Sequence, residues 1–137
     1  MNGLVKDGSR VSFHNPLIID ENFLRENHGV LFIFGDNSRR FGKGGAAKLR
    51  NEPNAIGFIT KKYPSNDESS FYNLKDYPTV FEDEKRRLLK IIEENKRSWI
   101  LISKLGGGLA NKYGIFENII QPWLESLEKY KNVILLY

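Results

Sequence analysis

The stretch VLFIFGDNSRRFGKGGAAKLR, residues 30–50, decides the expected fold. Residues 30–33 are apolar without a polar break, which predicts a strand buried on both faces. Four glycines crowd the loop that follows, and residues 46–50 are good helix formers. The predicted order is therefore strand, glycine-rich loop and helix. In an open α/β sheet, ligands bind at the carboxyl ends of the strands, and a glycine loop that feeds a helix offers free N–H groups to an anion such as phosphate.

The first glycine loop by itself leaves two interpretations open. It matches neither the dinucleotide fingerprint GxGxxG nor the P-loop GxxxxGK[ST]. It can be a tight turn whose glycines supply positive φ angles, or it can bind a phosphate or a nucleotide. Asp36 and Asn37 stand at the mouth of this loop.

A second glycine loop follows the apolar run at residues 99–102, which predicts another buried strand. Here Gly106, Gly107 and Gly108 are consecutive. Three consecutive glycines cost backbone entropy on folding, and a plain turn rarely needs three, so we expect a ligand to approach closely. If the two buried strands are neighbours, both loops meet at one end of the sheet and can grip one diphosphate.

The rest of the chain alternates between short apolar runs, which are typical of strands, and amphipathic or capped segments, which are typical of helices. Short apolar runs predict strands at residues 11–13, 17–19, 55–60 and 133–137. Asp20 is expected to cap a short helix through residue 27, and Thr79 and Glu82 form a capping box that opens a helix over residues 79–96. Residues 116–130 carry an amphipathic stripe, and Pro122 either kinks that helix or marks its first turn. Residues 65–76 are expected to form a loop over the site or a turn of helix. The sum is one α/β domain over residues 1–137, with five or six strands and three or four helices.

Composition excludes several classes of function. Of the 137 residues, 40% are hydrophobic and 28% are charged, as in an ordinary soluble globular protein. No apolar run approaches the roughly 18 residues of a membrane span, and the first residues lack the apolar core of a signal peptide, so we expect a cytoplasmic protein without a membrane partner. The chain has no Cys and only two His, so neither a disulfide framework nor a metal site is expected.

The net charge of +4 modestly favours anionic partners. Basic residues gather around the first glycine loop and the segment after it. They form either a solvated surface or a basic rim that attracts an anion, with nucleic acid among the candidates. The residues concerned are Arg39, Arg40, Lys43, Lys48, Arg50, Lys61 and Lys62.

These motifs together resemble a macro domain, the α/β/α module that binds ADP-ribose. The first loop, from Gly35 to Ala46, is similar to the macro loop that follows a buried strand, and the loop from Gly106 to Leu109 is similar to the one that grips the diphosphate. The resemblance implies a single macro-like three-layer α/β/α domain with a central mixed, mostly parallel sheet. It also implies that Asp20 contacts the adenine. The implied ligand-binding residues are Asp20, Gly35, Asn37, Lys43, Gly44, Gly45, Ala46, Gly106, Gly107, Gly108, Leu109 and Ala110.

A narrower resemblance concerns residues 58–74. The segments FITKK at 58–62, Pro64-Ser65 and residues 72–74 are similar to the terminal ADP-ribose glycohydrolase type of macro domain, a branch that includes DNA-de-ADP-ribosylating antitoxins. The resemblance implies that Lys61 is a nucleophile that attacks the anomeric carbon of the ribose. An unprotonated amine can form such an adduct, so this role requires a lowered pKa of Lys61. Nearby Lys62 and Lys43 and a desolvated cleft would lower it. The alternative is that Lys61 only binds phosphate.

One departure from this branch concerns the acid that helps to resolve the adduct. Ala110 stands where the branch has Asp, and the neighbouring Asn111 cannot act as a base. Asp36, or Glu68 in the loop over the site, is the candidate substitute. Without such an acid the protein can bind ADP-ribose without turning it over.

Three functions are therefore expected to compete. The first is a hydrolase that removes ADP-ribose from a modified protein or nucleic-acid acceptor, with Lys61 and Asp36 as catalytic residues and no cofactor. The second is a non-catalytic reader or sequestering binder of ADP-ribose or another NAD-derived nucleotide. The third is a nucleic-acid-binding module that uses the basic rim, with Tyr63, Phe71 and Tyr72 available to stack on bases.

Overall fold

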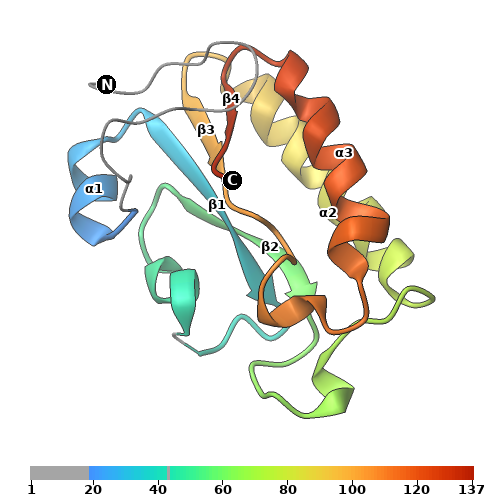
Figure 1. Cartoon of the computed structure of the whole chain (residues 1–137). Coiled ribbons are helices and arrows are strands. Elements are labelled where there is room, and N and C mark those ends of the chain that lie inside the picture. Colours follow the sequence, from blue (N-terminus) through green and yellow to red (C-terminus); the bar gives the residue numbers. More distant parts are fainter. Residues whose placement is uncertain (1–18, 43) are drawn as a thin grey trace.

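Four parallel strands form the sheet at the centre of the computed structural model, which describes residues 19–42 and 44–137 (Figure 1). They are β1 (Val30–Asn37), β2 (Ala55–Lys61), β3 (Trp99–Ile102) and β4 (Val133–Leu135), in the order β2-β1-β3-β4. The sheet was expected to be mixed and mostly parallel, and every strand pair among the described residues is parallel. The strand expected at residues 11–13, most of that at 17–19, and Lys43 lie outside the described residues.

Strand β1 lies between β2 and β3 and is buried on both faces, as its unbroken apolar run predicted. Its alternate side chains enter two different cores. Ile33 belongs to the core that contains helices α2 (Tyr77–Glu94) and α3 (Gln121–Ser126). Phe32 and Phe34 belong to the core on the other face, together with residues of helix α1 (Glu21–Glu26) and of the 3₁₀ helix η1 (Gly45–Leu49). The sheet is therefore covered on both faces, as in other parallel α/β folds.

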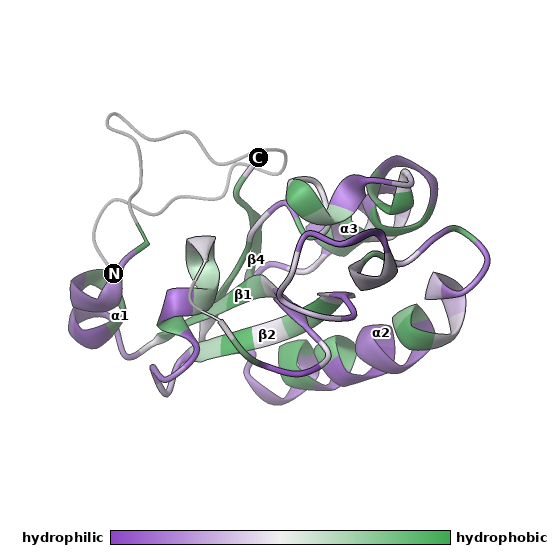
Figure 2. Cartoon of the chain, turned by 90° about the horizontal axis from the view of Figure 1, so that it is seen from below, coloured by the Kyte–Doolittle hydropathy of each residue, from purple (hydrophilic) through white to green (hydrophobic). Residues whose placement is uncertain are grey.

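Helix α2 begins at Tyr77, two residues before the expected capping box, so the prediction of a capping box at Thr79 is wrong. Pro78 lies in the first turn, where its missing N–H costs nothing. Tyr77 is fully buried and fixes this earlier start through packing against the core. Figure 2 shows green and purple residues mixed along α2, as expected for a helix with one face on the core and the other in solvent.

The expected helix over residues 116–130 is divided into three parts. They are a π-helical turn η4 (Phe116–Ile120), the α-helix α3, and a 3₁₀ turn η5 (Leu127–Lys129). Pro122 lies in the first turn of α3, which was one of the two predictions for it. Because Pro has no N–H, the preceding turn cannot continue as a regular α-helix, and the Gln121 N–H donates instead to the Phe116 carbonyl, five residues back.

Helix α2 also covers the outer edge of β2. Oε1 of the buried Glu84 accepts a hydrogen bond from the Ile59 N–H at 2.6 Å, and the Tyr77 hydroxyl donates to the Ile59 carbonyl at 2.7 Å. Arg87 pairs with Glu84 and donates to the Gly57 carbonyl. Side chains of the helix thus satisfy backbone groups that an edge strand otherwise leaves open.

Three short 3₁₀ helices lie in the connecting segments of the described chain. The segment expected to be a loop over the site contains one 3₁₀ turn, η2 (Glu68–Ser70), and the second glycine loop leads into η3 (Leu109–Asn111). The expected helix after the first glycine loop is the 3₁₀ helix η1. Within the described residues, no helix is both long enough and apolar enough to cross a membrane.

Candidate functional site

The two glycine loops meet because the strands that precede them are neighbours. Strand β1 pairs with β3 in parallel, with Ile33 opposite Ile102, so the loops that follow leave the same end of the sheet. A cavity of about 520 Å³ lies there, which we call the glycine-loop cavity. The structure brings most of the predicted site residues to its wall, namely Gly35, Asp36, Asn37, Gly44, Gly45, Ala46, Lys61, Gly106, Gly108, Leu109 and Ala110.

Two predicted residues do not line this cavity. The Asp20 side chain caps α1 by accepting the Phe23 N–H at 2.8 Å, and the expectation that it contacts an adenine has no support from its position. A Cβ atom on Gly107 would lie 2.6 Å from Cγ of Lys104, so this glycine makes room for a lysine side chain. Lys43 lies outside the described residues.

Several wall residues were missed by sequence reasoning. The cation among them is Lys104, whose Nζ lies 5.0 Å from the centroid of the Phe116 ring. Its place between a buried strand and the glycine triplet was a signal that could have identified it. The others are Phe41, Gly42, Ala47, Thr60, Pro64 and Asn66, all within six residues of a predicted site residue.

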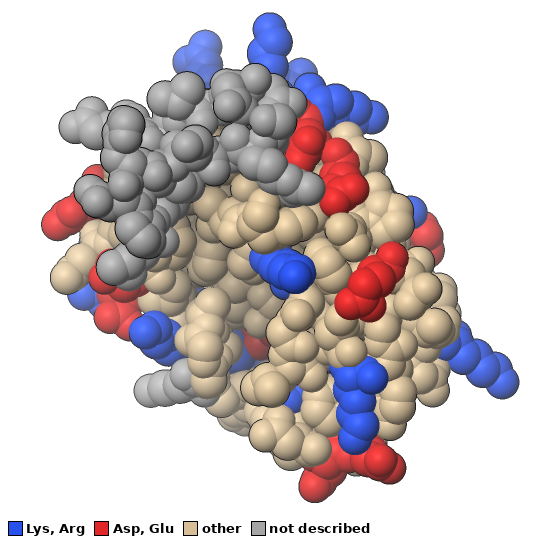
Figure 3. All heavy atoms as spheres, viewed as in Figure 1, with Lys and Arg blue, Asp and Glu red and all other residues tan. Residues whose placement is uncertain are grey.

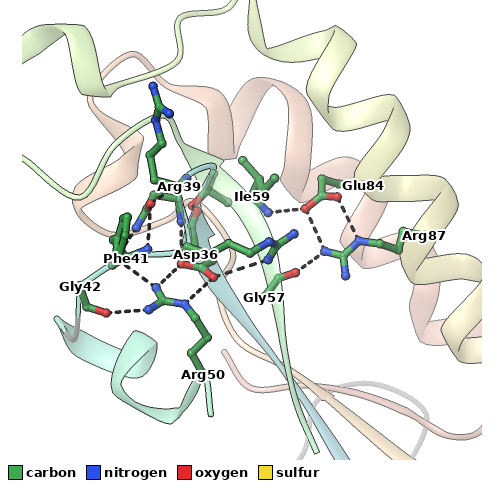
Figure 4. A network of polar contacts seen from close by, with 12 residues as sticks. Asp36, Arg39, Phe41, Gly42, Arg50, Gly57, Ile59, Glu84 and Arg87 are labelled. Carbon is green, nitrogen blue, oxygen red and sulfur yellow. Dashed lines mark hydrogen bonds and ion pairs between the residues drawn. The ribbon is translucent and has the colours of Figure 1, made fainter. Parts of the chain in front are cut away.

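The carboxylate of Asp36 is held by arginine (Figure 4). Its side chain has no exposed surface, and Arg50 binds both of its oxygens, with Nη2 at 2.5 Å from Oδ1 and Nε at 3.0 Å from Oδ2. Arg40 Nη1 lies 3.7 Å from Oδ2. This hydrogen bonding to Asp36 raises the pKa of Arg50. A carboxylate paired in this way is not a free general base, so the geometry does not support the catalytic role expected for Asp36.

The same arginine organises the first glycine loop. Arg50 Nη1 donates to the Gly42 carbonyl at 2.8 Å, and its Nη2 donates to the Phe41 carbonyl at 3.1 Å. The amide of Asn37 also acts within the loop, donating to the Phe41 carbonyl at 2.7 Å and accepting the Arg39 N–H at 3.0 Å. The side chains of Asp36 and Asn37 therefore shape the loop, which leaves ligand contacts to its backbone.

Gly57 in the middle of β2 is a structural requirement of this network. A Cβ atom there would lie 2.7 Å from Oδ2 of Asp36, closer than real Cβ atoms approach. The missing side chain lets the carboxylate reach its arginine partners beside the strand.

The backbone of both loops is open to a ligand at three glycines. Among the described residues, and apart from each glycine's chain neighbours, no atom lies within 4 Å of the position a Cβ would take on Gly44, Gly45 or Gly108. Gly45 has a φ of +56°, and Gly106 has a φ of +76°. A Cβ on Gly106 would also lie 2.7 Å from Cδ1 of Ile120, so this glycine is required by both its backbone angle and its close packing. The glycines therefore differ in what requires them, since Gly106 serves the turn whereas Gly44, Gly45 and Gly108 leave backbone open.

Lys61 lies at the end of β2 with its amine in the cavity wall. Nζ donates to the Ser65 carbonyl at 2.8 Å and lies 4.9 Å from the centroid of Phe71, which pairs with Lys61 in an isolated antiparallel bridge. Burial lowers the pKa of Lys61. Lys62 was expected to contribute to this effect, but its amine pairs with Asp76 at 2.8 Å.

The described wall of the cavity offers no unpaired carboxylate. Asp36 is its one acidic residue, and arginine holds it. Ala110 is buried in the wall where the resembled branch has Asp. Glu68, the other candidate substitute, does not line the cavity, and its largely exposed side chain lies 3.5 Å from Lys112. The wall thus carries the cations Lys61 and Lys104 without a free acid beside them.

Comparison with known proteins shows the family of this chain. The chain belongs to a family of unknown function (DUF7831), whose model matches residues 15–112. That range contains both glycine loops, Lys61 and the Asp36–Arg50 pair, and it ends before η4 and α3. No curated protein and no solved structure matches the chain.

Proposed function

We propose that this protein binds ADP-ribose, or another NAD-derived nucleotide diphosphate, in the glycine-loop cavity. The observation that carries the proposal is the convergence of two glycine loops, from neighbouring parallel strands, on one cavity with two cations and no free carboxylate in its described wall. Exposed backbone N–H groups and lysines favour a diphosphate, and an unpaired acid would repel it. The resemblance of both loops to those of macro domains selects ADP-ribose among such ligands.

The dimensions of the cavity are compatible with this ligand class. Sites for small molecules and cofactors have volumes of about 300 to 1,000 Å³, and the glycine-loop cavity has about 520 Å³. Two exposed apolar side chains, Phe41 and Leu109, come from the two different loops and line it. They offer apolar surface for the uncharged parts of a nucleotide, beside the polar backbone of the loops.

Binding without turnover is the form of the proposal that the site supports best. Hydrolysis of a glycosidic bond needs a group that moves protons in addition to a nucleophile. Neither Asp36 nor Glu68 is placed for that task, and Ala110 has no polar side chain. In this form Lys61 is a phosphate-binding cation, and the protein reads or sequesters the nucleotide.

A second candidate function is removal of ADP-ribose from a modified protein or nucleic acid. The observation that favours it is the position of Lys61 in the wall together with the lowering of its pKa by burial, which increases the fraction of neutral amine. The neutral amine would attack C1 of the ribose while the acceptor leaves with the bonding electrons. Water would then release the sugar from the lysine.

Calorimetric titration with ADP-ribose tests the binding proposal. Gly44 is the position to vary, because its φ of −72° and ψ of 138° suit any residue and no atom of the described residues beyond its chain neighbours lies near its Cβ position. Gly44→Glu adds a negative charge to the wall, while Gly44→Ser changes the same position without charge. We expect the wild type and Gly44→Ser to bind and Gly44→Glu to lose most of the affinity.

The proposal fails if the wild type shows no heat of binding with ADP-ribose, or if both variants bind as the wild type does. Incubation with ADP-ribosylated DNA and ADP-ribosylated protein then separates the two candidates. Release of ADP-ribose that is lost in Lys61→Ala would establish the hydrolase. Absence of release in a protein that binds ADP-ribose would establish the reader.

A further inference from the structure

A second group of cations lies at the opposite end of the sheet from the glycine-loop cavity. It surrounds two adjoining hollows of about 260 and 340 Å³, which share Arg97 and Trp99. These hollows lie at the amino-terminal ends of β1, β3 and β4, whereas the glycine loops leave the carboxyl ends. Because β1 has eight residues, the two ends are separated by roughly 25 Å at about 3.3 Å per residue.

The backbone holds the turns around these hollows side by side. The Trp99 N–H donates to the Gly29 carbonyl at 3.0 Å, and the Ile100 N–H donates to the Asn132 carbonyl at 2.7 Å. The amide of Asn132 also donates to the Asn95 carbonyl at 3.1 Å. Three turns that are distant in sequence therefore form one continuous surface.

The charge of this surface is positive. Lys96, Arg97 and Lys131 are exposed, and no ion pair joins any of them to a described carboxylate. Glu26 is the one acidic residue among the described residues that line the two hollows. Figure 3 shows blue side chains projecting from the upper edge of the molecule, where Figure 1 places the starts of β3 and β4.

An aromatic ring lies in the middle of these cations. Trp99 is half-buried and borders both hollows, while the next three residues of β3 are fully buried. Part of the Trp99 side chain packs against the core that contains Phe32 and Phe34, and the exposed remainder borders the hollows. An exposed part of an indole offers a nucleic-acid base a surface for stacking, and the surrounding cations attract phosphates. An acidic peptide would satisfy the cations but has no planar group that requires the indole.

We propose that this surface, formed by His28, Lys96, Arg97, Trp99, Lys131 and Asn132 and called here the Trp99 surface, binds single-stranded nucleic acid. A base stacks on Trp99, and the neighbouring phosphates pair with Arg97 and the two lysines. The site is independent of the glycine-loop cavity, so both can be occupied at once.

Fluorescence anisotropy with a labelled oligothymidylate at low salt tests this proposal on the full chain. Arg97→Glu and Lys131→Glu should each weaken binding about tenfold or more, and Trp99→Leu should weaken it about fivefold or more. The matched control is Arg86→Glu, the same charge change at an exposed position on α2, which should weaken binding less than threefold. The slope of log K against log salt should become shallower by about 0.7 for each cation removed.

Two further measurements distinguish binding at the Trp99 surface from binding in the glycine-loop cavity. Saturating ADP-ribose should leave oligothymidylate affinity unchanged, and so should Gly44→Glu, whereas binding in the glycine-loop cavity would respond to both. Indole fluorescence should change on binding in the wild type and lose that change in Trp99→Leu, because Trp123, the other tryptophan, packs against Phe58 and Phe81.

The proposal is overturned if the wild type does not bind the oligonucleotide at low salt. It is also overturned if Arg86→Glu weakens binding as much as Arg97→Glu, since the attraction would then come from net charge alone. Polyglutamate that displaces the oligonucleotide at equal charge concentration, with no effect of Trp99→Leu, would assign the surface to an acidic protein partner instead.

Discussion

Replacing Arg50 with Met should destabilise the protein more than most substitutions at a partly exposed position. The substitution keeps much of the aliphatic side chain and removes the guanidinium. Among the described residues, the Asp36 carboxylate, which has no exposed surface, then retains only the Asn37 N–H at 2.8 Å and Arg40 at 3.7 Å. The buried negative charge of Asp36 then lacks most of the hydrogen bonds and ion pairs that stabilise it.

The size of the effect follows from this geometry. Removing one partner of a buried ion pair costs about 3 to 5 kcal/mol, because the other charge stays buried without compensation. Arg50 is itself about one-fifth exposed, with a side-chain exposure of 21%, and Arg40 remains nearby, so we expect a value near the lower end of that range. With a urea m-value of about 1 to 3 kcal/mol/M, the midpoint should fall by roughly 1 to 3 M.

Urea denaturation followed by circular dichroism measures this change. The matched control is Arg86→Met, because Arg86 pairs with Asp83 at 3.8 Å and both side chains are exposed, at 77% and 75%. Exposed pairs contribute little to stability, so the control should leave the midpoint nearly unchanged.

A double variant decides whether buried charge is the cause. Adding Asp36→Asn to Arg50→Met removes the uncompensated carboxylate and should recover part of the lost stability. Buried charge is not the cause if the double variant is no more stable than Arg50→Met, or if Arg50→Met and Arg86→Met shift the midpoint equally.

Three further predictions concern pH and backbone geometry. Affinity for ADP-ribose should fall as pH rises through the lowered pKa of Lys61, because the amine loses its charge there. Calorimetry up to about pH 10.5, the ordinary lysine value, should show this fall in the wild type but not in Lys61→Gln. Turnover by a Lys61 nucleophile would instead rise through the same pH range. Gly106→Ala should cost about 2 to 4 kcal/mol of unfolding free energy, from its positive φ and from overpacking, while Gly44→Ala should stay within about 1 kcal/mol of the wild type in the same denaturation assay. Burial raises the pKa of Tyr77, so the folded state favours the neutral phenol. The contribution of this group to folding stability is complete below about pH 10 and is lost as pH rises toward the folded-state pKa. Tyr77→Phe should cost about 1 kcal/mol of unfolding free energy at neutral pH, for the lost hydrogen bond to Ile59, and should reduce the alkaline loss of stability.

The parts of the fold that the sequence predicted are those with a strong local signal. The apolar run of β1 is a strand buried on both faces, and the stripe after residue 115 packs into the core. The two glycine loops were expected to meet if β1 and β3 are neighbours, and these strands do pair with each other. Once these strands are neighbours, the rule for parallel sheets places both glycine loops at one cavity.

The structure departs from the local patterns where a distant contact overrides them. Asp36 looked like a candidate acid, but Arg50, fourteen residues away, reaches both of its oxygens, and no local pattern indicates that pairing. The Thr79 capping box is a sound local signal, yet packing of Tyr77 starts α2 earlier. Asp20 does cap a helix, as expected from its position, and its supposed second role at the ligand came only from the resemblance.

The cover that α2 places over the outer edge of β2 has a consequence for self-association. Strand β2 is an edge strand of the described sheet, and such edges invite strands from other chains to pair with them. Here the Ile59 N–H and carbonyl and the Gly57 carbonyl already have partners in Glu84, Tyr77 and Arg87, as Figure 4 shows in part. An incoming strand would have to displace a buried carboxylate to gain one backbone hydrogen bond. Strand pairing between copies of this chain through β2 is therefore disfavoured while α2 stays in place, and partial unfolding of that helix would open this edge to other strands.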